Sequence, residues 1–494
     1  MRLHGSAVYQ VRANGQNAEV VHVSGLNNES AKIMENSTYF GGVRVIKLDN
    51  DFHKSKEQGD ASLEGVQYDI INSSIGRVKL GDGRYINVGQ KVTTITTKKV
   101  GNEYVAETSR YLLPSGTYTV KEVKSSEGYK NGGFEKKFTI KDYSQDGGYT
   151  TLGVGTENAV QRGNIELTKA DFDFKKSESQ GDATLEGTEY RLINKSKNPV
   201  FVEGRIFEPG QEIKRYKAQK IGGEYKVVIP EKTLPYGSYT IEEVKASLGY
   251  NMVSFSKDFK ITKEGDVVKF NTSSSWSENK VQRGGLEVVK ADFDLDQSVP
   301  QGDATLEGVQ YNVVNRSKNA VYVNSKRVNV GEVAATITTK KVDGVYKAVL
   351  PNNALPYGTY DVVEVKNAQG YLLTPYTKQI QIRQDKEIVK LDYNTVWNKD
   401  KVERGGLELT KADFDLHKSI PQGDADLENT EYKITNKSKM PVVVNGQTYG
   451  VNAEIMKVKA HKQSDGTYKV VLANNTLPYG CLLYTSTLPT KRIV

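Results

Sequence analysis

The stretch RGGLEVVKADFDLDQSVPQGDATLEG, residues 283–308, decides the fold because the chain contains four copies of it. The other copies begin at Phe40, Arg162 and Arg404. The lysines of the K-x-D triplet in the four copies are Lys47, Lys169, Lys290 and Lys411. Their spacings are 122, 121 and 121 residues, far longer than the roughly 20 to 50 residues of a solenoid repeat. A unit of this length buries a core of its own, so the sequence predicts a tandem array of domains.

The copies divide the chain into three complete domains and parts of two others. The predicted bounds are 1–39 for the C-terminal remnant of a preceding repeat, 40–161, 162–282 and 283–403 for the complete domains, 404–480 for a truncated fourth domain and 481–494 for a tail. The remnant contains VYQVRANGQNAEVVHV, in which Asn-Gly between two alternating segments predicts a β-hairpin. The tail leaves the repeat pattern at Cys481 and resembles a translated sequencing adapter, so we expect it not to be native.

Each unit consists of short alternating segments that are separated by turn signals. The chain is rich in Tyr (29) and Gly (45) and poor in Pro (13), and turn signals about every 8 to 12 residues are typical of sandwiches. Landmarks shared by the units are a QGDA loop, an alternating strand such as VTTITTKKV, and LPSG or LPYG, which we interpret as a turn before a strand. The predicted fold class is all-β, with tandem Ig-like β-sandwich domains arranged as beads on a rod.

Composition argues against several function classes. The net charge of +8 comes from 68 basic and 60 acidic residues spread through the units, which gives little support to nucleic-acid binding. The single cysteine, Cys481, excludes a disulfide within the chain and a thiolate metal cluster. No apolar run is long enough to span a membrane, and the five histidines share no spacing. We therefore expect no conventional enzyme, no cofactor, no metal site and no membrane span.

One acidic series could suggest Ca²⁺. Asp292, Asp294 and Asp296 alternate in the third unit, but the position of the last aspartate is Lys175 in the second unit and His417 in the fourth. The ligand set of a calcium loop is therefore incomplete. The sequence favours a solvated acidic loop.

Three polar residues in each complete unit continue an apolar face. The K-x-D lysine follows a period-two apolar series, and a glutamate follows the Tyr-x-hydrophobic pattern after the LPxG turn. An Asn or Asp that lies 11 residues before the next lysine is followed, two places on, by a valine. The resulting sets are Lys47, Glu122 and Asn158; Lys169, Glu243 and Asn279; and Lys290, Glu364 and Asp400. Asn36 and Lys411 stand at equivalent positions without the rest of a set.

Such a set has a specific chemistry. Burial of an unpaired charge shifts the pKa of a lysine or a glutamate toward the neutral form, and a neutral amine is a nucleophile. An amine beside an asparagine can attack its carbonyl carbon, while the glutamate polarises that carbonyl and moves protons. The product is an intramolecular isopeptide bond, with loss of ammonia from Asn or of water from Asp. Two other interpretations remain: a buried ion pair, or an edge strand with a snorkelling lysine.

The sequence also resembles the collagen-adhesin B-type and SpaA-type pilin domains of Gram-positive surface proteins. The matching segments are LTKAD and LEG near the start of the units and YTVKEVKSSEGY, YTIEEVKASLGY and YDVVEVKNAQGY around the glutamates. The resemblance implies a prealbumin-like sandwich with the lysine and Asn or Asp as crosslink partners and the glutamate as the catalytic residue. It also implies an extracellular protein of the cell wall or cell surface, whose partners are other wall or pilus components and possibly a host matrix protein.

The crosslink would set the mechanical path through the chain. It would close loops from 47 to 158, 169 to 279 and 290 to 400, and it would stabilise each domain as a disulfide does, by about 4 kcal/mol or more for loops near 100 residues. Only the 11-residue connectors would then carry tension through unprotected backbone. The sequence predicts a self-crosslinked stalk or pilin-like protein; the alternative is an adhesin whose repeats bind a host or matrix ligand.

Overall fold

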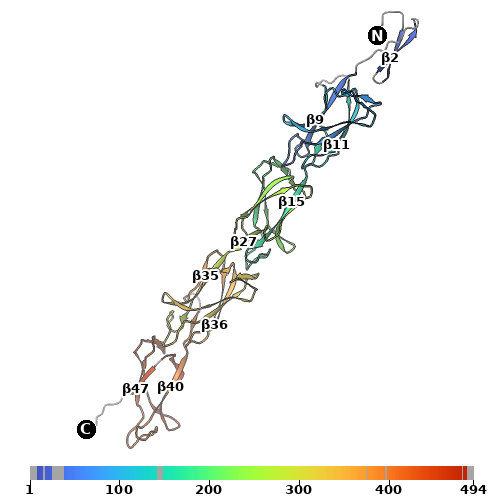
Figure 1. Cartoon of the computed structure of the whole chain (residues 1–494). Coiled ribbons are helices and arrows are strands. Elements are labelled where there is room, and N and C mark those ends of the chain that lie inside the picture. Colours follow the sequence, from blue (N-terminus) through green and yellow to red (C-terminus); the bar gives the residue numbers. More distant parts are fainter. Residues whose placement is uncertain are drawn as a thin grey trace.

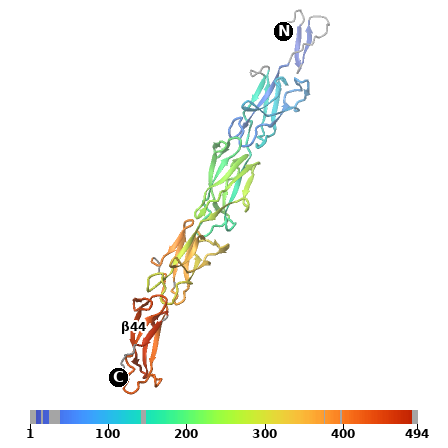
Figure 2. The same cartoon turned by 60° about the vertical axis from the view of Figure 1, so that its left-hand side comes forward.

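The computed structural model describes residues 8–14, 17–24, 38–141, 148–374, 376–394, 398–480 and 482–486. All regular elements in these residues are β-strands. The units follow one another along a rod, with the hairpin of β1 (Val8–Asn14) and β2 (Asn17–Ser24) at one end (Figures 1 and 2). The predicted all-β class, the tandem sandwiches and this hairpin are confirmed.

The second domain shows the sandwich that the repeat encodes. Its first sheet is built around β15, which pairs with strands that come later in the unit. These strands are β15 (Arg162–Asp171), β20 (Gln219–Ile221), β21 (Glu224–Val228), β22 (Leu234–Pro235), β24 (Tyr250–Asn251), β26 (Val267–Phe270) and β27 (Ser277–Val281). The second sheet has the order β19, β16, β23, β25, with β16 (Glu189–Asn194), β19 (Glu212–Lys217), β23 (Gly237–Lys245) and β25 (Ser256–Ile261). A small hairpin consists of β17 (Val200–Val202) and β18 (Arg205–Phe207).

The first and third domains repeat this arrangement. The first contains β3 (Phe40–Asp49), β4 (Gln67–Asn72), β5 (Val78–Lys79), β6 (Tyr85–Ile86), β7 (Lys91–Thr96), β8 (Lys98–Val100), β9 (Glu103–Glu107), β10 (Leu113–Pro114), β11 (Gly116–Lys124), β12 (Glu135–Ile140), β13 (Tyr149–Leu152) and β14 (Glu157–Asn158). The third contains β28 (Arg283–Val289), β29 (Ala291–Asp292), β30 (Gln310–Asn315), β31 (Val321–Val323), β32 (Lys326–Val328), β33 (Val333–Thr338), β34 (Lys340–Val342), β35 (Val345–Pro356), β36 (Gly358–Lys366), β37 (Thr377–Ile382), β38 (Ile388–Leu391) and β39 (Lys399–Asp400).

The fourth unit has a smaller described set of strands. They are β40 (Arg404–Lys411), β41 (Glu431–Asn436), β42 (Val442–Val444), β43 (Gln447–Tyr449), β44 (Glu454–Lys459), β45 (His461–Lys462), β46 (Tyr468–Pro478) and β47 (Leu482–Ser486). The last of these lies in the segment that we expected to be a non-native tail. It pairs antiparallel with β41, as β23 pairs with β16 in the second domain.

The core follows from the period-two pattern of each strand. Val43 and Val45 in β3 are fully buried, and Lys47 continues the same face with no exposed surface. They pack with residues of the opposite sheet such as Ile70 and Val120. Because β3 pairs with neighbours on both sides, the interpretation of the lysine strand as an edge strand is wrong.

The segment VTTITTKKV was expected to be one strand, and the structure divides it between the two sheets. β7 pairs with β4 in one sheet, and β8 pairs with β9 in the other. Thr97 lies between them and is fully buried, with its Oγ1 donating to the Leu63 carbonyl at 2.6 Å and accepting from the Val66 N–H at 2.9 Å. The hydrogen bonds of the buried threonine thus stabilise the point at which the chain crosses from one sheet to the other. Strand propensity alone does not predict this crossing.

The first connector between the predicted crosslinks contacts both of the domains that it joins. Within the first connector, the Gln161 N–H donates to the Gly128 carbonyl and the Gln161 carbonyl accepts from the Tyr236 N–H, both at 2.7 Å. Gly128 belongs to the first domain and Tyr236 to the second. The connector is therefore hydrogen-bonded to both of its neighbours.

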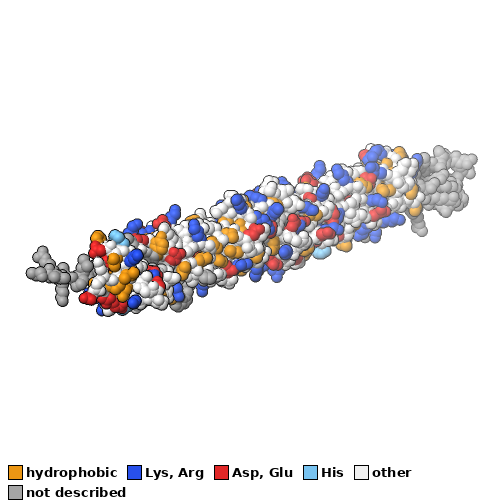
Figure 3. Space-filling view, turned by 90° about the horizontal axis from the view of Figure 1, so that it is seen from below, with side chains coloured by type: hydrophobic (Ala, Val, Ile, Leu, Met, Phe, Trp, Pro, Cys, Tyr) orange, Lys and Arg blue, Asp and Glu red, His pale blue; other side chains and the backbone are white. Residues whose placement is uncertain are grey.

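The surface of the rod is mixed in charge. On the face seen in Figure 3, basic and acidic side chains are interspersed along the whole length instead of being gathered on one side. Among the described residues, no helix is long and apolar enough to cross a membrane.

Candidate functional site

Each of the first three domains brings its predicted lysine, glutamate and Asn or Asp together between the two sheets. In the first domain Lys47 lies on β3, Glu122 on β11 of the opposite sheet and Asn158 on β14, which runs parallel to β3. The alternation of each strand points these side chains inward. All three residues are buried.

In the first domain the glutamate bridges the other two side chains. Lys47 Nζ lies 2.9 Å from Glu122 Oε2, and Asn158 Nδ2 donates to Glu122 Oε1 at 2.6 Å. The Asn158 Oδ1 atom accepts a hydrogen bond of 2.9 Å from the Gly132 backbone N–H. One carboxylate therefore holds the amine and the amide side by side.

The second domain has the same geometry with one additional hydroxyl. Lys169 Nζ lies 2.8 Å from Glu243 Oε2, and Asn279 Nδ2 donates to Glu243 Oε1 at 2.6 Å. Ser277 Oγ accepts from Lys169 at 3.0 Å and donates to Glu243 at 2.8 Å. The Val253 N–H binds Asn279 Oδ1 at 3.1 Å.

In the third domain an aspartate replaces the asparagine and changes the hydrogen bonding. Lys290 Nζ lies 2.7 Å from both Glu364 Oε2 and Asp400 Oδ1. The contact with Asp400 lacks hydrogen-bond geometry, and within the part of the chain that the structure describes Glu364 Oε1 and both Asp400 oxygens have no hydrogen-bond partner. An asparagine would donate to the glutamate here, whereas two carboxylates need a shared proton. Asn398 Oδ1 accepts hydrogen bonds from the Tyr311 hydroxyl at 2.8 Å and from Lys290 Nζ at 3.3 Å.

Burial shifts the pKa values in the directions that the proposed chemistry needs. Desolvation lowers the pKa of Lys47 and lowers that of Lys169 to about 8, although the neighbouring glutamates oppose the shift. Desolvation, together with the charge of Asp400, raises the pKa of Glu364 against the opposing effect of Lys290. These shifts move Lys47 and Lys169 toward the neutral amine and Glu364 toward the neutral acid.

The sequence did not predict two features of these sites. One is the backbone N–H of Gly132 or Val253, which polarises the amide oxygen. The other is an edge-to-face aromatic pair whose first tyrosine lies opposite each glutamate in the sheet register: Tyr68 with Phe134, Tyr190 with Phe255, and Tyr311 with Tyr376. These aromatic residues recur at matching positions in the three units, a signal from which the second feature could have been found.

Asn36 and Lys411 are the two residues that were predicted without the rest of a site. Asn36 lies outside the described residues. Lys411 is half-buried at the end of β40. In the fourth unit Ser486 pairs with Tyr432 in the register that Glu243 and Tyr190 have in the second domain, so a serine stands where the other units have the glutamate.

The interpretation of the acidic series as a solvated loop is wrong for its first member. Asp292 is fully buried, and its Oδ2 accepts hydrogen bonds from the Tyr371 hydroxyl at 2.7 Å and from Gln301 at 3.0 Å. Asp294 pairs with Arg404 of the next unit at 2.9 Å. Among the described residues, no cluster of His, Cys, Asp and Glu is arranged to hold a metal ion.

Comparison with known families matches the three complete units. Residues 49–154, 170–275 and 297–396 each match the SpaA prealbumin-like fold domain. The chain belongs to the SpaA family of prealbumin-like domains. The matched ranges include the three glutamates and exclude the lysines and the Asn or Asp residues, whose roles therefore depend on the geometry above.

Solved structures with similar folds include pilins. The Bacillus anthracis TIE protein is 21% identical, with 78% of this chain and 57% of that chain covered and a TM-score of 0.44. This chain thus matches less than two thirds of that protein. A streptococcal ancillary pilin is 19% identical over 73% of this chain and 99% of its own, with a TM-score of 0.24. BcpA, the major pilin subunit of Bacillus cereus, is 13% identical over 72% and 98%, also with a TM-score of 0.24. Comparison with curated protein sequences gives no match.

The aspartate of the third SpaA domain leads to a prediction about pH. Lys290→Met removes the cation beside Glu364 and Asp400 and leaves two buried carboxyl groups. The pKa of Glu364 is already raised in the folded domain, so the native state binds a proton that the unfolded state releases above its pKa of about 4.5. The stability of this domain is therefore expected to fall, by on the order of 3 kcal/mol, as the pH rises from about 5 through the folded pKa. Calorimetry from pH 5 to 8 measures this dependence.

Lys169→Met provides the matched control. Glu243 keeps the hydrogen bonds that Ser277 and Asn279 donate, and an amide stands beside it where the third domain has the Asp400 carboxyl group. The pH dependence should therefore be smaller in the second domain. Equal slopes for the two variants would contradict a proton shared by Glu364 and Asp400.

Proposed function

We propose that each of the three complete domains forms an intramolecular isopeptide bond: Lys47 with Asn158, Lys169 with Asn279, and Lys290 with Asp400. The observation that carries the proposal is the glutamate bridge, in which one buried carboxylate contacts the amine and the amide at 2.6–2.9 Å in the first two domains. An ion pair alone would not need the amide. In addition, the desolvation penalty of a fully buried Lys–Glu pair can exceed its electrostatic gain. Three such pairs are therefore weak evidence for a role in noncovalent stability alone.

The reaction follows from the hydrogen bonds around Asn279. A proton moves from Lys169 Nζ to Glu243, which leaves a neutral amine. The amine attacks the Asn279 Cγ atom, and the charge that develops on Oδ1 is stabilised by the Val253 N–H. Glu243 then delivers a proton to Nδ2, with which it already shares a hydrogen bond. The C–N bond breaks, ammonia leaves, and the new amide nitrogen returns a proton to the glutamate.

The first domain has the same groups, with the Gly132 N–H at the amide oxygen. In the third domain the leaving group is an Asp400 oxygen, which must depart as water. The proton shared with Glu364 makes the carboxyl carbon electrophilic, since an ionised carboxylate resists attack by an amine. The raised pKa of Glu364 favours a proton held between the two carboxyl groups, which stays on an Asp400 oxygen as its hydroxyl. Lys290 passes one of its own protons to Glu364 before it attacks. Glu364 then delivers that proton to the Asp400 hydroxyl, which leaves as water, and the new amide nitrogen returns a proton to Glu364.

The reaction is single-turnover chemistry of the domain upon itself. The side chains of Lys47, Glu122, Lys169 and Glu243 have no exposed surface, so an external substrate does not reach them in the folded domain. We therefore assign no enzymatic turnover to the chain.

At the level of the whole molecule, we propose a structural stalk or pilin-like protein on the surface of a Gram-positive bacterium. Support comes from the tandem SpaA domains, the rod in which they are arranged (Figure 1) and the buried sites repeated along it. Its partners would be other components of the cell wall or pilus. The intact mass of the chain under denaturing conditions tests the crosslinks on which this function depends.

A further inference from the structure

The QGDA loops have no part in the proposed crosslink, yet each lies where one domain meets the next. We name these loops sockets: residues 58–61, 180–183 and 301–304. Gln58, Gln180 and Gln301 are fully buried. We propose that the three sockets are specific docking sites for the end of the following domain that faces them. This docking fixes the orientation of consecutive domains.

Backbone hydrogen bonds join the first socket to the second domain. The Gly59 N–H donates to the Pro199 carbonyl at 2.9 Å, and the Gly59 carbonyl accepts from the Asn198 N–H at 3.1 Å. The Asp60 N–H donates to the Tyr236 carbonyl at 3.1 Å. The same bonds recur at the second socket, where the Gly181 N–H donates to Ala320 at 3.0 Å and the Asp182 N–H to Tyr357 at 3.1 Å.

The aspartate and the glutamine of the socket add side-chain contacts. Asp60 accepts from the Lys197 N–H at 2.9 Å and from the Ser238 hydroxyl at 2.6 Å. The Oε1 atom of Gln58 accepts from the Phe201 N–H at 2.9 Å. Asp182 and Gln180 make the corresponding contacts with the third domain. Undocking would leave the buried Gln58 amide and the half-buried Asp60 carboxylate without these partners, which makes it costly.

The glutamine also connects the socket to the crosslink site. Gln58 Nε2 donates to Asp49 Oδ2 at 3.1 Å and to Asp51 Oδ2 at 2.9 Å. Asp49 follows Lys47 on β3 and pairs in register with Asn158. Asp51 forms an ion pair of 2.8 Å with Arg162 of the second domain. The socket is therefore built on the strand that carries the reactive lysine.

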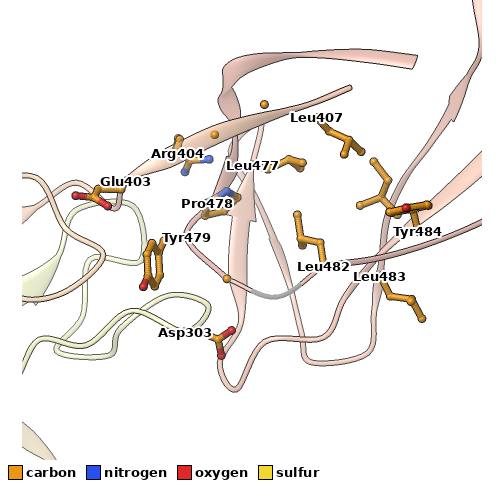
Figure 4. Close-up of a pocket in the computed structure, with 14 residues that line it drawn as sticks. Asp303, Glu403, Arg404, Leu407, Leu477, Pro478, Tyr479, Leu482, Leu483 and Tyr484 are labelled. Atoms are coloured by element: carbon orange, nitrogen blue, oxygen red, sulfur yellow. The ribbon is translucent and has the colours of Figure 1, made fainter. Parts of the chain in front are cut away.

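The tyrosine of LPYG completes each joint. A Cβ atom on Gly128 would lie 2.8 Å from the Tyr236 ring, and the Tyr236 hydroxyl donates to Glu127 at 2.6 Å. Tyr357 packs in the same way against Gly249. Figure 4 shows the third joint, where Asp303 of the third domain lies near Tyr479 of the fourth unit; the two are linked by a 3.2 Å backbone hydrogen bond. In addition to preceding a strand, the LPYG segment therefore contributes a tyrosine to the contact between consecutive domains.

The addition of one methyl group at Gly59 tests the contact between the first and second domains. A Cβ atom on Gly59 would lie 2.1 Å from the Tyr236 carbonyl oxygen, so Gly59→Ala should force the first and second domains apart. Gly65→Ala is the matched control in the same domain. Gly65 also has a positive φ, +91° against +63° for Gly59, but a Cβ atom there meets nothing within 4 Å.

The measurement is the distance between spin labels in the full chain, after Cys481→Ser removes the only cysteine. Thr139, Lys260 and Gln381 are exposed and occupy equivalent register positions in the three domains. One sample carries Thr139→Cys with Lys260→Cys across the first joint. The other carries Lys260→Cys with Gln381→Cys across the second.

We expect a narrow distance distribution for both pairs in the parent chain. Gly59→Ala should broaden the first distribution at least ~twofold and leave the second unchanged, and Gly65→Ala should change neither. Tyr236→Ser, which introduces the residue that Ser115 provides in the first domain, should also broaden only the first. The proposal is overturned by broad distributions in the parent, by no response to Gly59→Ala and Tyr236→Ser, or by equal broadening in Gly65→Ala or across both joints. It does not rest on the crosslink, whose presence in each sample is read separately from the intact mass.

Discussion

The intact mass of the full chain under denaturing conditions is expected to be lower than the mass of its sequence by two molecules of ammonia and one of water. Each Lys–Asn bond releases ammonia, and the Lys290–Asp400 bond releases water. Denaturation removes noncovalent contacts, so only a covalent change alters this mass. The bond should form without any added factor, because the amine and the amide share one carboxylate in the folded domain.

Single substitutions assign the losses to individual sites. Glu243→Ala should restore one ammonia, and Glu364→Ala should restore one water. Glu242→Ala is the matched control, since Glu242 precedes Glu243, the proposed catalytic glutamate, on β23 but forms an ion pair with Arg191 on the surface. Its mass loss should equal that of the parent. An unmodified parent mass would reject the crosslink and leave the three sites as buried ion pairs within a noncovalent rod.

When the chain is pulled from its ends, the residues enclosed by each crosslink are expected not to add to its extension. In the parent, tension enters the second domain along β15, crosses from Lys169 to Asn279 and leaves toward the third domain. The 109 residues between these positions then bear no tension. In Glu243→Ala the bond is absent, and unfolding of this domain should release these residues, on the order of 370 Å of chain.

In single-molecule force spectroscopy, the length of chain released in each unfolding step distinguishes the possible outcomes. The parent and Glu242→Ala should show no step of this length from the three complete domains, and Glu243→Ala should show one per molecule. A parent trace with three such steps would contradict the crosslinks. A variant without the step would show that the domain resists force through its packing alone.

The sequence by itself determined the repeat, the all-β class and the residues of each site. The reason is local: a lysine that continues an apolar series with period two must share the buried face of its strand, as Lys47 does with Val43 and Val45. Three residue types at repeated offsets then indicate one shared site. Nothing in this inference required knowledge of which strands are neighbours.

Contacts between distant segments could not be predicted in this way. The Gly132 N–H reaches Asn158 from a loop 26 residues earlier, and backbone donors have no sequence signature. Thr97 is buried and hydrogen-bonded to Leu63 and Val66, which lie 34 and 31 residues earlier. Asp292 is buried and accepts a hydrogen bond from Tyr371, 79 residues later.

Only the tertiary structure decided how the domains meet. The QGDA and LPYG motifs are visible as repeats in the sequence, but their partners lie in different domains, as Asp60 and Ser238 do across 178 residues. A hydrogen bond between such positions depends on the placement of two folded units against each other. Strand periodicity describes the faces within a unit and contains no information about this placement.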